Sequence, residues 1–294
     1  MTVLPIVLMH RYCRKSTEIV MMNLYDRLFK PKKYILENGK TVWERRSRTP
    51  LILLIMVLMI MISIKITDFS LAVLIKRMKF FFVMLLDMFP PDGSYIPQIW
   101  KPLLDTLKMS LLGSFIGAIA CIPFSILSST NLVHAKAITA FFKVFFSVVR
   151  TLPTLVAALI ATYIFGLGTL AGTVAIAVFT FAYCGKILYE SMETCSMGSF
   201  EALEALGCGK PSAIRYAIVP QVLPSYLSTV LFCFEGNVRY ASILGYVGAG
   251  GLGLILNEKI GWREYGKVGM ILIALFLTVA AIESLSQYLR SKLV

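Results

Sequence analysis

The sequence predicts an all-α integral membrane protein with about six transmembrane helices, an additional interfacial helix and a further helix in a cytoplasmic loop. Hydrophobic residues make up 57% of the chain and charged residues only 15%, against about 25% charged residues in soluble domains. The mean hydropathy is +0.77, and several apolar runs approach or exceed the roughly 18 residues that a membrane-spanning helix needs. The third observation is that basic residues cluster beside the first apolar run.

Residues 1–48 are predicted to form a basic cytoplasmic arm. Eleven of the 29 Lys and Arg residues lie in this segment, and they account for much of the net charge of +13. Such clustering beside a membrane span is typical of the cytoplasmic side, so it explains the charge without nucleic-acid binding. The predicted loops and termini on the side that holds both ends of the chain contain more Lys and Arg residues than the predicted loops on the opposite side. We therefore expect a multi-pass protein of the cytoplasmic membrane with both termini in the cytoplasm.

Residues 49–102 are predicted to hold the first span and an outer interfacial helix. The span is Pro50–Ile66, an almost uninterrupted apolar run. The next apolar segment, Leu71–Phe89, carries four charges, each costing about 2.5–3.5 kcal/mol at the centre of a spanning helix. We therefore expect this segment to lie in the outer interface, with a buried span as the alternative. Pro90–Pro102 is rich in turn-forming residues and is predicted to be a loop.

Residues 103–290 are predicted to form the main transmembrane domain, with a polar loop at about residues 190–216. A break at Arg150–Pro153 interrupts the second of its spans. The predicted spans are about Leu103–Leu127, Lys136–Phe165, Thr173–Leu188, a span that starts near Ala217, and Val268–Leu285.

The residue inventory argues against an enzyme, a metal site or a cofactor. The six cysteines contain no CxxC pair and mostly lie in apolar runs, so we interpret them as small buried hydrophobic residues. His10 and His134 are the only histidines, which makes a metal site implausible. No cluster of nucleophile, acid and base with catalytic spacing is present, and the glycine-rich stretch lacks the GK[ST] that a phosphate loop requires.

The segment Phe200–Pro224 is predicted to form two short helices joined at a glycine break. Gly207 and Gly209 are suited to ending the first helix, and Pro211 is suited to the first turn of the second. Apolar residues recur every three positions in the first helix, and Glu201 and Glu204 lie beside them. The residues of this apolar stripe are Met197, Phe200, Leu203 and Leu206.

This segment resembles the EAA loop of binding-protein-dependent ABC importer permeases. Glu201-Ala202-Leu203 stands for the EAA triplet, Gly207 for the glycine, and Ala217, Val219 and Pro220 for the I-x-L-P end. Leu203, Ala217 and Val219 depart from the family pattern but remain apolar. The resemblance implies a coupling helix that docks onto cytoplasmic ATP-binding subunits through Glu201, Ala202, Glu204 and Gly207. An ordinary amphipathic loop helix is the alternative.

A polar cluster, Glu235, Asn237 and Arg239, interrupts the apolar region that follows. Fifteen residues of helix from Pro220 rise roughly 22 Å, which predicts a position in the outer half of the membrane or at its outer mouth. Ionisable residues inside a membrane usually face a bundle interior or an aqueous path. The alternative is that Glu235 and Arg239, four residues apart, only neutralise each other. Gly248, Gly250 and Gly251 are expected to allow a tight crossing or a broken helix.

Arg150 and Arg239 are the best candidates for a path that carries an anion, since each is costly to bury without water or a partner. Thr151 and Thr154 flank Pro153, and their hydroxyls are expected to join Arg150 there. We assign Glu235, Asn237, Gly248, Gly250 and Gly251 to the same path.

Three segments are similar to the phosphonate-type branch of the importer permeases: Ile122–Asn131, Arg150–Pro153 and Asn237–Gly251. The resemblance covers about Trp100 to Leu285 and implies the type I ABC importer permease fold. It also implies a homodimer in the lipid bilayer, two ATP-binding subunits and an extracytoplasmic solute-binding protein. The expected cargo is phosphonate or a related small oxyanion. The alternatives are phosphite, phosphate or another small solute, and, in a different class, an ATP-independent secondary transporter.

Overall fold

The computed structural model describes residues 33–35, 41–43 and 49–293, with side chains from residue 52 onward. The chain divides into two compact units, Met1–Arg77 and Met78–Val294. Most of the predicted basic arm, residues 1–48, lies outside the described residues. Its described parts are two short antiparallel strands, β1 (Lys33–Ile35) and β2 (Thr41–Trp43). Every other regular element of the described chain is helical.

Two apolar helices follow the strands. α3 (Thr49–Ile66) confirms the first predicted helix, and α4 (Leu71–Asp87) covers the segment with four charges. The axes of α3 and α4 differ by 68° across the short break between them. The described part of the chain buries no side chain of α4. That α4 lies in the interface therefore remains a prediction.

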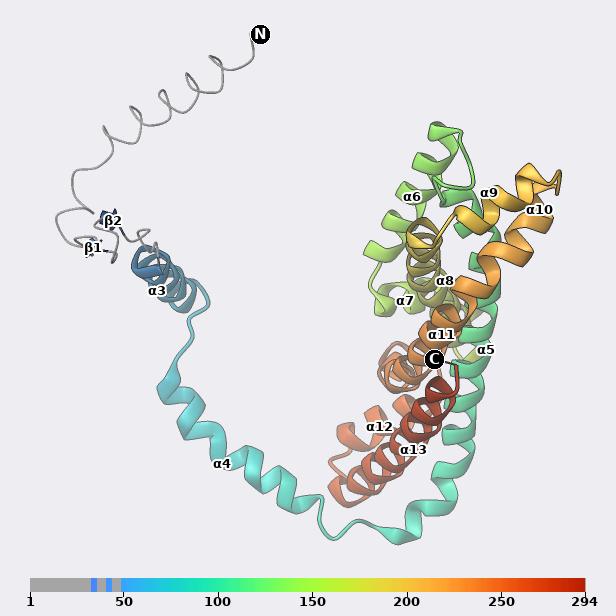
Figure 1. Ribbon diagram of the computed structural model, residues 1–294. Coiled ribbons are helices and arrows are strands. Elements are labelled where there is room, and N and C mark those ends of the chain that lie inside the picture. The colour runs from blue at the N-terminus through green and yellow to red at the C-terminus, as the bar shows by residue number, and fades with distance from the viewer. Residues whose placement is uncertain (1–32, 36–40, 44–48, 294) are drawn as a thin grey trace. The chain divides into compact units, whose positions relative to one another are not determined.

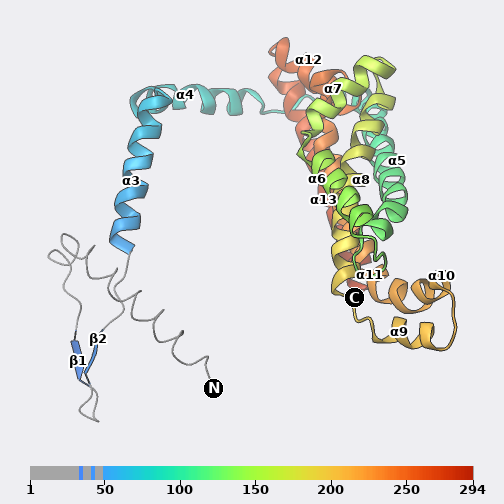
Figure 2. The ribbon, with the colours of Figure 1, turned by 90° about the horizontal axis from the view of Figure 1, so that it is seen from above.

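The second unit is a bundle of long helices with short helices at both ends (Figures 1 and 2). α9 and α10 lie at one end of the bundle, and α12 lies at the other. α13 runs from the α12 end back towards the α9 end (Figure 2). The helices are α5 (Ile96–Ser128), α6 (Lys136–Thr151), α7 (Thr154–Phe165), α8 (Thr169–Thr194), α9 (Gly198–Ala205), α10 (Lys210–Ala213), α11 (Val219–Leu244), α12 (Leu252–Gly261) and α13 (Tyr265–Ser291). A π-helical turn, Ile214–Ile218, joins α10 to α11.

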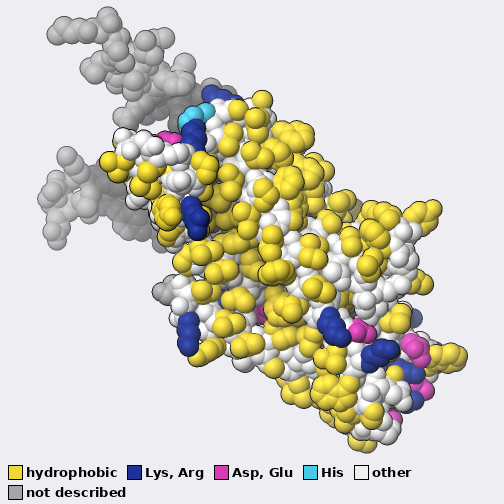
Figure 3. Space-filling model, turned by 90° about the vertical axis from the view of Figure 1, so that its right-hand side faces the viewer, with side chains coloured by type: hydrophobic (Ala, Val, Ile, Leu, Met, Phe, Trp, Pro, Cys, Tyr) yellow, Lys and Arg dark blue, Asp and Glu magenta, His cyan; other side chains and the backbone are white. Residues whose placement is uncertain are grey.

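By length and composition, four helices of the described chain can cross a membrane, and the number rises to six if each bent pair forms one span. The two pairs are α3 with α4 and α6 with α7. Hydrophobic side chains cover most of the face shown in Figure 3. Many large ones are exposed along the spanning helices, such as Phe115 and Phe276, as expected for surfaces that face lipid. The predicted all-α membrane fold is confirmed.

The bend between α6 and α7 is 88° and falls at the predicted break. Pro153 lacks a backbone N–H and disfavours helical conformation in the residue before it. Leu152 is accordingly extended, with φ −72° and ψ 117°. The predicted interruption of this span is therefore confirmed.

Two features of the helix boundaries differ from the prediction. α5 starts at Ile96, so the predicted loop Pro90–Pro102 is wrong over its second half. Ile99 and Leu103 pack into a buried cluster with Leu252 and Ile271, and this packing outweighs the local turn signals. α12 was not predicted, because its ten residues follow a glycine-rich stretch that gave no helical pattern.

Small residues bring α5 and α8 into close contact. A Cβ added to Gly117 of α5 would lie 2.5 Å from the carbonyl oxygen of Ala177, and one added to Gly113 would lie 2.7 Å from Ile176. Small residues are the usual means of close helix approach in membranes, where the hydrophobic effect does not drive helices together.

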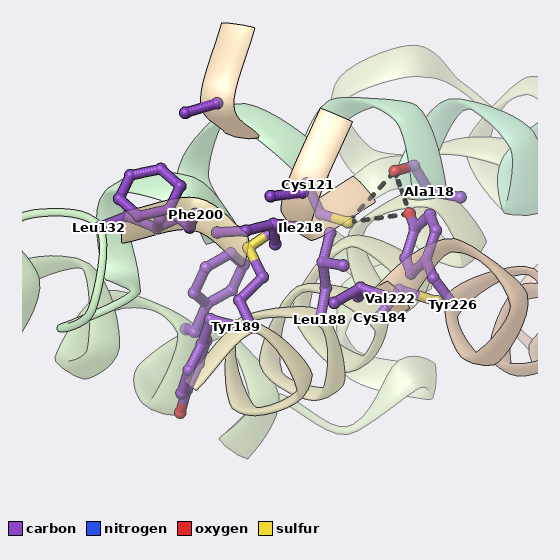
Figure 4. Packing of buried hydrophobic residues seen from close by; sticks show 14 of the residues in the cluster. Ala118, Cys121, Leu132, Cys184, Leu188, Tyr189, Phe200, Ile218, Val222 and Tyr226 are labelled. Carbon is purple, nitrogen blue, oxygen red and sulfur yellow. Dashed lines mark hydrogen bonds between the residues drawn. The ribbon is translucent and has the colours of Figure 1, made fainter. Parts of the chain in front are cut away.

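The largest core cluster joins residues of α5, α6, α8, α9 and α11, and Figure 4 shows part of it from close by. Tyr226 of α11 donates a hydrogen bond from its hydroxyl to the carbonyl oxygen of Ala118 at 2.5 Å. Its hydroxyl oxygen also lies 3.3 Å from Cys121 Sγ. Cys121, Cys184 and Cys233 are all buried in this cluster, as predicted for small hydrophobic residues.

The α5–α8 contact predicts that Gly117→Ala destabilises the protein by about 1–3 kcal/mol, because the new methyl group overlaps backbone atoms of α8. Thermal unfolding of the detergent-solubilised protein measures the effect. Gly236→Ala in α11 is the matched control, since a Cβ there meets only Tyr240, at 3.9 Å. Equal unfolding temperatures for the two variants would contradict the assigned contact.

Candidate functional site

α9 is held to the bundle by one face and exposes the other. Phe200 is 5% exposed and belongs to the core cluster, where it lies near Leu132 (Figure 4). Met197 and Leu203 are partly buried against the same cluster. Leu206, the fourth residue of the predicted apolar stripe, is 80% exposed. That part of the prediction is wrong, because α9 ends at Ala205 and the chain turns away.

Gly207 ends α9 as the sequence predicts. Its φ is +85°, a left-handed conformation that suits glycine and strains residues with a Cβ. Gly207 N donates to Glu204 O at 2.9 Å and Cys208 N donates to Leu203 O at 3.0 Å, the two bonds of a Schellman motif. Gly209 has a φ of −63° and is instead the N-cap of α10.

The predicted contact residues Glu201, Ala202, Glu204 and Gly207 are all exposed. Glu201 and Glu204 line a hollow of about 220 Å³ beside α9, and Lys210 borders the same hollow. The other lining residues are Asn131, Leu132, His134, Met197 and Phe200. The structure thus brings both glutamates to one surface at the α9 end of the bundle.

Two polar clamps connect this end to the long helices. Gln221 of α11 accepts a bond from Ser196 N and donates one to Ser196 O, both at 3.1 Å, so the start of α9 is tied to α11. Glu193, near the end of α8, accepts bonds from Thr130 N at 2.8 Å and from Lys143 Nζ at 2.8 Å. Sequence reasoning missed both clamps, because their partners lie on separate segments and form no local motif.

Further along α11, a groove of about 370 Å³ lies between α11 and α8. Its aromatic lining comes from Phe179 and Tyr183 of α8 and from Phe232 and Tyr240 of α11. Arg239 is the charged residue of the lining, and about half of its side chain is exposed. Cys233, Gly236 and Ile243 complete the lining. A guanidinium in an apolar, aromatic groove is suited to a small anion.

Asn237 lies behind the groove, inside the bundle. Its Nδ2 donates to Ser114 Oγ of α5 and to Thr180 Oγ1 of α8, each at 2.8 Å. Ser114 and Thr180 stand near the middle of their helices, so Asn237 is at mid-depth in the bundle. Glu235 and Arg239 are within one turn of it.

The prediction that this cluster lies in the outer half of the membrane or at its outer mouth is not tested, and the structure places Asn237 at mid-depth in the bundle. The estimate assumed that the helix enters the membrane near Pro220. Gln221, next to Pro220, is hydrogen-bonded to Ser196, which lies beyond the end of α8. The first turns of α11 therefore lie at the α9 end of the bundle. The remaining rise brings Asn237 only to the level of Thr180.

Glu235 is almost fully buried and holds two arginines. It forms ion pairs with Arg239 on its own helix and with Arg290 on α13, the latter at 3.4 Å. The sequence alternative, an i,i+4 pair of Glu235 and Arg239, is thus present in the structure. Arg290 was missed, because 55 residues separate it from Glu235.

The other predicted path residues lie elsewhere. Arg150 and Thr151 are exposed at the bend between α6 and α7, and Thr154 is partly buried. None of the three lines the groove between α8 and α11. The predicted path role of these residues is not tested by their position.

The predicted broken helix is confirmed at Gly248, Gly250 and Gly251, whose φ values are all positive, between +71° and +81°. The segment reverses the chain between α11 and α12 and packs against Thr106 of α5 and the start of α8. Leu252 N donates to Thr106 Oγ1 at 2.7 Å, and Gly168 N donates to Gly248 O at 3.0 Å. These glycines do not line the groove.

Comparison with known proteins agrees with this geometry. Residues 121–293 match the family described as binding-protein-dependent transport system inner membrane component. The chain belongs to this family. It is therefore the membrane-embedded permease subunit of an ABC importer, a multi-pass protein of the inner membrane.

Two relatives are permeases for phosphorus oxyanions. This permease is 29% identical to the putative phosphite transport system permease protein HtxC of Stutzerimonas stutzeri, over 88% of this chain and 92% of that protein. It is 33% identical to the phosphate-import permease protein PhnE of Mycolicibacterium smegmatis, over 70% of this chain and 39% of that longer protein. Among solved structures, an inward-facing MetNI methionine ABC transporter has a similar fold. Its TM-score is 0.62 at 20% identity, and the match covers 69% of this chain and 99% of that chain.

The hydrogen bonds of Asn237 predict that Asn237→Leu destabilises the permease by about 1–3 kcal/mol, because Thr180 Oγ1 loses its buried partner. Thermal unfolding in detergent checks this. Asn257→Leu on the exposed face of α12 is the control and should leave the unfolding temperature unchanged. If Asn237→Leu unfolds at the same temperature as the control, the network does not stabilise the bundle.

Proposed function

We propose that this permease moves phosphonate or a related small phosphorus oxyanion into the cell, driven by ATP hydrolysis on separate cytoplasmic subunits. The observation that carries the proposal is the continuity of α11. Gln221, near one end of this helix, is hydrogen-bonded to Ser196 just before α9, and Arg239, eighteen residues further on, lines the groove. A push on α9 would therefore reach the groove through a single stiff element.

Cytoplasmic ATP-binding subunits would dock on the exposed face of α9. Glu201, Ala202 and Glu204 present that face, and Gly207 sets the direction in which the chain leaves it. This assignment rests on the EAA-like pattern and on the exposure of these residues. By this proposal the α9 end would lie in the cytoplasm, and with it the C-terminal end of α13. The N-terminal arm, residues 1–48, is proposed to be cytoplasmic from its eleven Lys and Arg residues alone. The excess of Lys and Arg on that side supports the same orientation.

A second copy of the permease would close the path. The groove between α8 and α11 is open on one side and leaves Phe232, Tyr240 and half of Arg239 exposed. In a homodimer two such grooves would face each other and form a route between the copies. An extracytoplasmic solute-binding protein would deliver the anion at the α12 end.

The cargo follows from the groove and from the relatives. The groove offers one guanidinium among aromatic side chains, and a guanidinium binds tetrahedral oxyanions through paired hydrogen bonds. The named relatives carry phosphite and phosphate in their descriptions, and the resemblance in Asn237–Gly251 points to phosphonate. Another small solute is the remaining alternative within this class.

Uptake by proteoliposomes tests the proposal. The permease, assembled with its ATP-binding subunits and supplied with its solute-binding protein, should accumulate phosphite, phosphate or methylphosphonate only when hydrolysable ATP is present. A non-hydrolysable ATP analogue is the control. Accumulation driven by an ion gradient without ATP would instead identify a secondary transporter.

The left-handed conformation of Gly207 at the end of α9 predicts that Gly207→Val lowers ATP-driven uptake about tenfold. A β-branched residue in the left-handed region costs about 1–2 kcal/mol, and 1.4 kcal/mol corresponds to a factor of about ten. Membrane abundance should be unchanged, because a Cβ at this position meets no atom within 4 Å. Gly198→Val, at the other end of α9, is the control, since that glycine also has open space and its φ is not positive. Normal uptake by Gly207→Val with normal ATPase association would refute the coupling role.

A further inference from the structure

A group of three charges, Glu235, Arg239 and Arg290, connects the groove to the end of α13. Glu235 Oε1 accepts a hydrogen bond from Arg239 Nη2, and Glu235 Oε2 accepts one from Arg290 Nη2 at 3.4 Å. Glu235 is only 4% exposed, so each of its carboxylate oxygens is matched to one guanidinium.

Of these three residues Arg239 lines the groove, whereas Arg290 lies next to one of the lining residues. Arg239 is part of the lining and about half exposed. The guanidinium carbon of Arg290 lies 5.9 Å from the ring centre of Phe232, another lining residue. Among the described residues, the polar partners of Arg290 are Glu235 and the Ser286 carbonyl oxygen. Arg290 thus has little to bind except Glu235.

The net formal charge of the group is +1, because two guanidiniums share one carboxylate. Glu235 and Arg239 alone would be neutral, and a neutral pair attracts an anion no better than it attracts a cation. Arg290 therefore supplies the surplus charge. Arg290 also keeps its ion pair with Glu235 when the Arg239 side chain moves away, so that the buried carboxylate is not left without a partner.

We propose that Arg290 is the residue that makes the groove selective for anions. An oxyanion that enters the groove takes the guanidinium of Arg239 from Glu235, while Arg290 keeps Glu235 neutralised. When the anion leaves, Arg239 returns to Glu235. The exchange makes binding favourable yet brief, as transport requires. The inference rests on the proposed function and assigns a specificity-determining role to a residue near the C-terminal end of the chain.

The test distinguishes the effect of the positive charge of Arg290 from its structural effect. It uses three variants of the complete complex in proteoliposomes, with phosphite as the probe. Arg290→Gln removes the surplus charge and should lower ATP-driven uptake at least about tenfold, while ATPase activity stimulated by the binding protein stays near the wild-type level. Glu235→Gln combined with Arg290→Gln restores the net charge of +1 and should recover most of the uptake. Arg290→Lys keeps the charge and should retain at least about half of the uptake.

Lys292→Gln is the matched control. It removes a basic residue from the same helix end, where Lys292 Nζ lies 4.6 Å from the ring centre of Tyr288 and forms no ion pair with a described carboxylate. This variant should transport as the wild type does.

Three outcomes overturn the inference: normal uptake by Arg290→Gln, uptake by the double variant as low as that of Arg290→Gln, or equal losses in Arg290→Lys and Arg290→Gln. The second and third would show that Arg290 only anchors α13. Should Arg290→Gln fail to assemble, the comparison of Arg290→Lys with Lys292→Gln still decides. Failure of the wild-type complex to import phosphite, phosphate or methylphosphonate with ATP would count against the proposed function instead.

Discussion

The close contact of α5 and α8 is the constraint on which the rest of the bundle depends. Gly113 and Gly117 let the two backbones approach to a distance at which even a methyl group would overlap. In lipid, where the hydrophobic effect does not press helices together, such contacts and interhelical hydrogen bonds hold a bundle. Ser114 and Thr180 then stand on facing helices at the right separation to share the amide of Asn237.

α11 takes its position from that pair and brings the functional elements with it. Asn237 holds the middle of α11 to α5 and α8, and Tyr226 holds it to α5 through the carbonyl oxygen of Ala118. Gln221 holds the first turns of α11 to Ser196, just before α9. The face opposite Asn237 carries Arg239 and Tyr240 into the groove. The groove and the start of α9 are therefore connected through one helix, α11.

Local signals in the sequence were sufficient for most of the helices and for α9. Pro153 predicted the break between α6 and α7, and Gly207 predicted the end of α9, because each residue restricts its own backbone. Boundaries that depend on packing were less predictable. The start of α5 at Ile96 contradicts the turn-forming residues around it, since Ile99 and Leu103 gain burial against α12 and α13. Leu206 was predicted to continue the apolar stripe but is exposed, because periodicity alone does not reveal where a helix ends.

The sequence by itself determined that the protein is a helical membrane protein, where most of its long helices lie, and which loop resembles the ATPase-contacting loop of importer permeases. These conclusions follow from composition, charge and short spacings, which act over a few neighbouring residues. The tertiary structure alone decided that Asn237 stands at mid-depth, that Glu193 and Gln221 are clamps, and that Glu235 holds Arg290 as well as Arg239. Apart from Glu235 and Arg239, which are four residues apart, those pairings join groups 25 to 123 residues apart, and only the packing of the helices determines which of them meet.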